Sequence, residues 1–188
     1  GLDTDADCVA KTRKLLHAKG LYGNATAITF DGKKLPYVEK TVNLIAINDP
    51  KYTVSSEEIV RVLAPRGIAF LPKDLKFAAK DFTKEVQGDY VAYRKPVPAD
   101  TDEWSHFLHD ASGNAVAHDE QVGPPRHLQW IGSPRWSRHH DRMASMSAMV
   151  SAGGRVFYIM DEGSRVSIQM PPQWMLIARD AFNGTVLW

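Results

Sequence analysis

The chain has 188 residues, of which 44% are hydrophobic and 24% charged, a composition that indicates a packed globular protein and excludes global disorder. Its formal net charge of +1 gives no long-range field, so no nucleic-acid partner is expected. No apolar run approaches the ~20 residues that cross a bilayer, so membrane insertion is not expected. The single cysteine, Cys8, excludes an internal disulfide framework and Cys-based zinc patterns.

Helix and strand patterns alternate over residues 1–95. The expected elements, in chain order, are a helix at 6–19, strands at 25–30 and 42–47, a helix from 55 to about 63, a strand at 68–71 and a helix at 73–86. Asp3-Thr4-Asp5 offers N-cap oxygens to the first helix, and Ser55 with Glu58 forms a capping box for the second. The alternation predicts an α/β domain with a mainly parallel, Rossmann-like sheet.

The rest of the chain changes character. A segment rich in His and Trp at 96–150 is predicted to connect the first domain to a strand-and-turn region at 151–188. Strands are expected at 155–160, 165–169, 174–179 and 185–188, and the last two flank a hairpin turn that ends at Gly184. Met143, Met146 and Met149 lie three apart, which favours a packed helix face. Because the chain stops at Trp188 inside a predicted strand, we expect a fragment of a larger protein.

Four stretches of the first half carry a family resemblance: Gly1-Leu2-Asp3, Asp31, residues 41–45 and residues 57–67. Together they resemble the back half of a class I S-adenosylmethionine-dependent methyltransferase. The resemblance implies that Asp3 binds the ribose hydroxyls and Asp31 approaches the adenine amine of S-adenosylmethionine in a complete domain. The glycine-rich loop of the family would precede Gly1, and Asn43 replaces a common acid, so the implied activity is either retained or degenerate. Alternatively, Asp3 is a helix cap and Asp31 a turn residue.

Residues 176–188 and the strand at 154–158 resemble one repeat of a pyrroloquinoline-quinone (PQQ)-like β-propeller. In that family Gly184 would supply positive φ in the hairpin and Trp188 would pack between blades. The resemblance implies an antiparallel first blade, further blades of the same propeller as its partner, and PQQ as a cofactor.

Both resemblances together match large multidomain bacterial proteins of the planctomycete type that fuse a methyltransferase-like domain to such a propeller. The implied function is that of a bidomain protein whose propeller is a quinoprotein-like platform or one that binds protein or carbohydrate. The resemblance implies a periplasmic or extracellular location, with the cytoplasm as the alternative. A non-enzymatic propeller scaffold is a second interpretation.

Six of the seven histidines fall between residues 106 and 140. His106 and His109 would share a helix face at i, i+3, and His118, His139 and His140 could add further ligands to a zinc, copper or iron site. This segment supports a third interpretation, a quinone- or metal-dependent oxidoreductase. The alternative is that its His, Trp, Asp and Arg side chains form a buried polar network that fixes an irregular segment.

Overall fold

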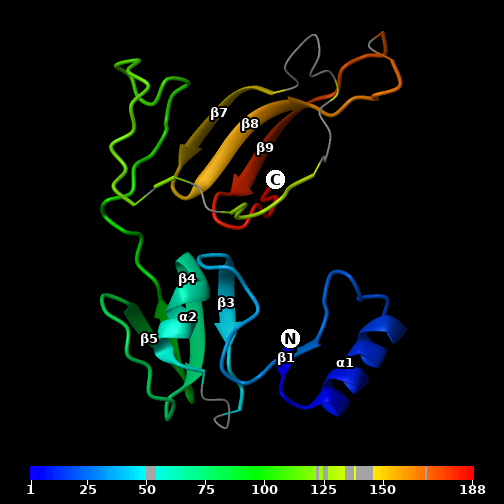
Figure 1. Cartoon of the computed structure of the whole chain (residues 1–188), viewed down its shortest axis with the longest axis vertical. Helices are drawn as coiled ribbons and strands as arrows, with labels where there is room; N and C mark the ends of the chain where they lie inside the picture. The colour runs from blue at the N-terminus through cyan, green and yellow to red at the C-terminus, as the bar shows by residue number, and fades with distance from the viewer. Residues whose placement is uncertain (50–53, 122, 125–126, 134–137, 139–145, 168) are drawn as a thin grey trace. The chain divides into compact units, whose positions relative to one another are not determined.

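The structure, a computed structural model, describes residues 1–49, 54–121, 123–124, 127–133, 138, 146–167 and 169–188 (Figure 1). The chain divides into two compact units, Gly1–Pro96 and Val97–Trp188. Within these described ranges, no helix combines the length and the apolar character needed to cross a bilayer.

The described residues of the first unit form two separate sheets and two helices. Its elements are β1 (Leu2–Asp3), α1 (Ala6–Ala18), β2 (Ile28–Thr29), β3 (Val42–Ala46), α2 (Ser56–Val62), β4 (Leu63–Pro72), β5 (Thr83–Gln87) and β6 (Tyr90–Arg94). β1 and β2 form a parallel pair, and the other four strands form a sheet in the order β3-β4-β6-β5. β3 is parallel to β4, whereas β6 runs antiparallel to both β4 and β5.

Helix α1 begins at a well-formed cap. The N-cap is Asp5, whose carboxylate accepts hydrogen bonds from the backbone N–H groups of Asp7 and Cys8, and so satisfies two of the free donors at the helix start. Val9 is the buried residue of this helix. Most of α1 is exposed, and among the described elements it packs mainly on the short β1–β2 pair.

The core of the first unit forms where α2 packs against β4. Ser55 caps α2 by accepting the N–H of Glu58 at 3.2 Å. The Glu58 carboxylate accepts hydrogen bonds from the backbone N–H of Leu35, at 2.7 Å, and from the guanidinium of Arg61. These bonds hold the 35–37 loop on the helix. The buried core consists of Leu35, Ile47, Val54, Ile59, Val62, Leu63, Ala69 and Leu71.

The predicted Rossmann-like α/β domain is wrong. The helix expected at 73–86 does not form: this stretch is loop followed by β5, which makes a hairpin with β6 through Gly88-Asp89. Gly88 has φ of +59°, as a two-residue hairpin turn requires. Two of the three strand pairings in the larger sheet are thus antiparallel. The described residues also supply only two helices, where an alternating α/β domain needs more.

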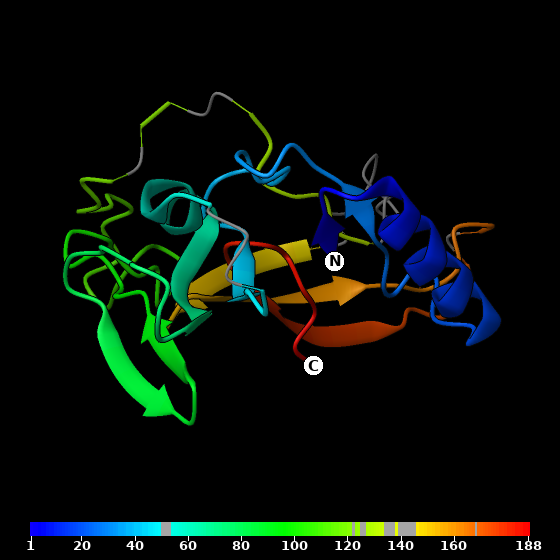
Figure 2. The ribbon, with the colours of Figure 1, turned by 90° about the horizontal axis from the view of Figure 1, so that it is seen from below.

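In the part of the second unit that the structure describes, β7 (Met146–Ala152), β8 (Arg155–Asp161) and β9 (Trp174–Asp180) form an antiparallel sheet, side by side in that order (Figure 2). After β9 the carboxylate of Asp180 accepts the N–H groups of Phe182 and Asn183. The turn closes at Gly184, with φ of +72°, where a Cβ atom would overlap the ring of Trp130.

The predicted propeller blade is also wrong, because the described residues form an open sheet of three strands. Residues 185–188 add one isolated bridge, between Val186 and Arg179. The strand expected at 165–169 is absent at the residues described there, and Ile168 lies outside them. Met146 and Met149 lie in strand β7, not on a helix face, and Met143 lies outside the described residues.

A buried ion pair organises the loop where that strand was expected. The Arg138 guanidinium lies 2.8 Å from the Asp161 carboxylate and also donates to the carbonyl of Ser164. The other carboxylate oxygen of Asp161 accepts the N–H groups of Gly163 and Gln173. Arg138 and Asp161 thus bind backbone groups on both sides of residues 165–169, so side chains hold the loop between β8 and β9 without strand pairing.

Candidate metal centre

The histidine segment begins as an irregular loop that is tied to strand β7. Ser151 donates its backbone N–H to the carbonyl of Trp104 at 2.7 Å, and its hydroxyl accepts the Trp104 N–H at 3.0 Å. The carboxylate of Glu103 accepts the N–H of Gly153 at 2.6 Å. The start of the loop therefore has a fixed position on the sheet although it contains no helix or strand of its own.

His109 is held in an unusual backbone conformation. Its φ is +73°, a left-handed value that costs energy for a residue with a side chain. The His106 N–H donates to the His109 carbonyl at 3.0 Å, and the ring of Trp104 packs edge-on against the His109 ring at 5.2 Å. His109 is only 4% exposed. The surroundings thus impose the conformation, which is a feature common at functional sites.

Asp102 is the centre of the hydrogen-bond network. One of its carboxylate oxygens, Oδ2, lies 2.6 Å from Nε2 of His109 and accepts the backbone N–H of His118 at 2.7 Å. The hydrogen bond from the His118 N–H, followed by that from the His109 ring, lowers the pKa of Asp102 to about 2. The carboxylate is therefore ionised throughout the physiological pH range.

His118 completes a cluster of three side chains. Its ring lies edge-to-face with the ring of His109, with the ring centroids 5.2 Å apart, and the residue is exposed to solvent. One ligand atom from each of Asp102, His109 and His118 lies within 4.8 Å of the other two. Two imidazole nitrogens and one carboxylate oxygen form a donor set that suits zinc, iron or copper.

Of the other predicted ligands, only His106 belongs to the described residues, and it is not part of this cluster. His106 and His109 form an isolated bridge instead of a helix turn, so the expected shared helix face is wrong. His106 is exposed, and its Nδ1 lies 3.0 Å from the Ser105 hydroxyl. His139 and His140 lie outside the described residues.

Sequence reasoning missed Asp102. It lies 7 residues before His109 and 16 before His118, and no local spacing rule connects them. A compositional signal was present: the stretch from Val97 to Gln121 contains six acidic residues and neither Lys nor Arg.

The two residues proposed to bind S-adenosylmethionine are used by local turns. The Asp3 carboxylate accepts the N–H of Asp5, and that of Asp31 accepts the N–H groups of Lys33 and Lys34, each at 2.8 Å. Backbone bonds from Lys34 and then Lys33 lower the pKa of Asp31.

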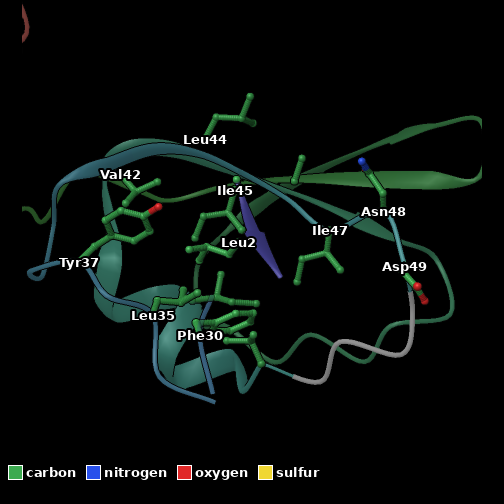
Figure 3. A pocket seen from close by; sticks show the side chains of 14 residues that line it. Leu2, Phe30, Leu35, Tyr37, Val42, Leu44, Ile45, Ile47, Asn48 and Asp49 are labelled. Carbon is green, nitrogen blue, oxygen red and sulfur yellow. The ribbon is translucent and has the colours of Figure 1, made fainter. Parts of the chain in front are cut away.

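A cavity of about 570 Å³ lies beside these turns, lined mostly by apolar side chains that include Leu2, Phe30 and Ile45 (Figure 3). Neither Asp3 nor Asp31 is among its described lining residues. The structure therefore does not bring Asp3 or Asp31 into this cavity, and the S-adenosylmethionine contacts stay a prediction.

No protein-family model and no curated protein matches the chain. The site is therefore interpreted from its own geometry.

Proposed function

We propose that the second unit binds one divalent transition-metal ion through Asp102, His109 and His118. The observation that carries the proposal is the convergence of their three ligand atoms within 4.8 Å. In this arrangement the ion would lie between Oδ2 of Asp102 and Nε2 of His109, in place of the hydrogen bond that now joins them at 2.6 Å. Metal–ligand distances of about 2.0–2.2 Å then require only a small separation of the two groups.

The charge of the surrounding segment favours a cation. Six acids and no basic side chain fall between Val97 and Gln121, so the local field attracts positive ions although the whole chain is nearly neutral. The low pKa of Asp102 keeps one ligand ionised without a competing proton.

The donor set indicates the class of ion. Two imidazoles suit Zn²⁺, Fe²⁺ or Cu²⁺, whereas Ca²⁺ and Mg²⁺ prefer oxygen ligands throughout. The single cysteine, Cys8, belongs to the first unit, so no thiolate of this chain is available within the second.

In a tetrahedral site, the three ligands found among the described residues would leave a position for water or a substrate, an arrangement typical of reactive metal sites. His118 is exposed, which gives the ion access to solvent. An ion held in this way would lower the pKa of a bound water or polarise a substrate oxygen. Among the interpretations drawn from the sequence, this site supports the metal-dependent one.

The test compares Zn²⁺ binding to the full chain and to two single variants, measured by competition with a chromogenic chelator. His118→Ala removes a ligand, while His106→Ala removes an exposed histidine of the same segment that lies outside the cluster. We expect one equivalent of Zn²⁺ to bind the unmodified chain. Removing a residue that only contacts a metal ligand lowers metal affinity by roughly 10- to 100-fold, so we expect His118→Ala, which removes a ligand itself, to lose at least that much. His106→Ala should bind Zn²⁺ as the parent does.

Two results would contradict the proposal. If the unmodified chain binds less than about 0.2 equivalents of Zn²⁺, Fe²⁺ or Cu²⁺ under conditions where structural sites saturate, the cluster is a hydrogen-bond network and not a metal site. If both histidine variants lose affinity equally, the ion is held elsewhere in the segment.

A further inference from the structure

The two ring nitrogens of His109 face two different carboxylates. Nε2 lies 2.6 Å from Oδ2 of Asp102, on the side of the ligand cluster. Nδ1 lies 3.6 Å from Oδ2 of Asp110, which is not one of the three clustered ligands. Asp110 is therefore placed behind the ring, on the side away from the proposed ion.

The Asp110 carboxylate is held in that position by its own turn. Its other oxygen, Oδ1, accepts the backbone N–H of Ser112 at 2.8 Å and the Ser112 hydroxyl at 2.5 Å. The Gly113 N–H also donates to the Asp110 carbonyl at 3.1 Å, which closes the turn. One carboxylate oxygen is thus anchored, and the second is directed at the histidine.

We propose that Asp110 is a positioning residue that orients His109 for metal binding. When Nε2 binds an ion, the single ring proton must reside on Nδ1, and Oδ2 of Asp110 is the acceptor placed to receive its hydrogen bond. A modest rotation of the ring or of the carboxylate would shorten the distance between Nδ1 of His109 and Oδ2 of Asp110 from 3.6 Å to hydrogen-bond length. This inference rests on the proposed metal site and adds a carboxylate that contacts one of the ligands and not the ion itself.

Such an outer carboxylate acts in two ways. It selects the tautomer whose Nε2 lone pair is free for the ion, and it makes the imidazole a stronger donor. His109 needs this support because its backbone has φ of +73° and its ring is almost fully buried, so the ring has few alternative orientations.

The experiment measures Zn²⁺ affinity of the full chain, of Asp110→Asn and of Glu120→Gln, by chelator competition. Asp110→Asn keeps an oxygen for the Ser112 turn but removes the charge that faces Nδ1. Glu120→Gln removes one negative charge from the same acidic segment and is the matched control. We expect Asp110→Asn to weaken binding by about 10- to 100-fold, and Glu120→Gln to stay within about twofold of the parent, as loss of an exposed charge predicts.

A second readout separates positioning from a general effect on the fold. In the Zn²⁺-loaded parent chain, the Nδ1–H proton of His109 should give a sharp, downfield NMR resonance because it is hydrogen-bonded. Asp110→Asn should broaden this resonance through faster exchange with solvent, while the melting temperature of the metal-free variant stays at the parent value.

The possible failures are distinguishable. If the unmodified chain binds no Zn²⁺, the proposed function fails and this inference fails with it. If the chain binds Zn²⁺ but Asp110→Asn matches it in affinity and in the His109 resonance, only the role of Asp110 is overturned. Equal losses in Asp110→Asn and Glu120→Gln would also overturn it, because net charge alone would then explain the effect.

Discussion

The carboxylate of Asp31 is engaged by its own turn, through the N–H groups of Lys34 and Lys33. These bonds lower the pKa of Asp31 below its ordinary value of 3.8. A lowered pKa in the folded state means that the stabilisation is complete above pH 3.8 and is lost as the pH falls through the folded-state pKa. One oxygen of this carboxylate, Oδ1, is thus used by the turn.

Carbon-detected NMR of the Asp31 carboxyl group tests this assignment. We expect a titration midpoint below 3.8 and no change in the resonance when S-adenosylmethionine is added. An Asp31→Asn sample identifies the signal. A midpoint at or above 3.8, or a resonance that moves with the cofactor, would show that the carboxylate is free to bind it.

Residue identity predicted part of the metal centre. His109 and His118 were candidates because imidazoles are common ligands, and the structure places both in the cluster. Asp102 was missed, because its contact with His118 depends on a loop that returns after 16 residues. The positive φ of His109 was equally inaccessible, because nothing in the neighbouring sequence marks this histidine, among several, as left-handed.

Helix α2 connects the core of the first unit to the 35–37 loop, and its start depends on one hydroxyl. Ser55→Ala removes the acceptor for the Glu58 N–H. We expect the free energy of unfolding of the first unit to fall by about 1 kcal/mol. Urea denaturation followed by circular dichroism would measure the change.

Ser55→Asp is the matched variant, because an aspartate at the N-cap accepts the same bond and suits the helix dipole. It should retain parent stability. If Ser55→Ala and Ser55→Asp were equally stable, the cap would contribute nothing and the helix would depend on burial of residues such as Ile59 alone.

Elements with strong local signals were predicted well. The helix expected at 6–19 is α1, and the strands expected at 42–47 and 155–160 are β3 and β8, within one residue at each end. The helix expected at 73–86 failed because Leu75, Phe77 and Phe82 reach the core from a loop, so their spacing resembles a helix face without forming one. The Gly88-Asp89 turn was the competing signal.

Charge is distributed unequally along the whole molecule. Every lysine lies in the first unit, and the second unit carries arginines as its only basic residues apart from histidine. Two of these arginines, Arg138 and Arg179, are buried and donate to carbonyl or carboxylate oxygens. The acidic segment around Asp102 therefore has no lysine of its own unit to neutralise it, which is consistent with a cation site.

The fold class of the whole chain was the least predictable feature. Helix and strand patterns can show which segments are regular, but the direction of β6 and the three-stranded β7–β9 sheet depend on pairing between distant segments. The resemblances to a methyltransferase and to a PQQ-like propeller remain predictions about function, and the architecture that they implied is wrong.

The most direct test of the central claim is a long-range ¹H–¹⁵N NMR spectrum of the histidine rings of the full chain during titration with Zn²⁺. We expect one equivalent to move the ring nitrogens of His109 and His118, with those of His106 unchanged. The account is contradicted if no histidine ring responds, or if the ion shifts other histidines while His109 and His118 keep their metal-free signals.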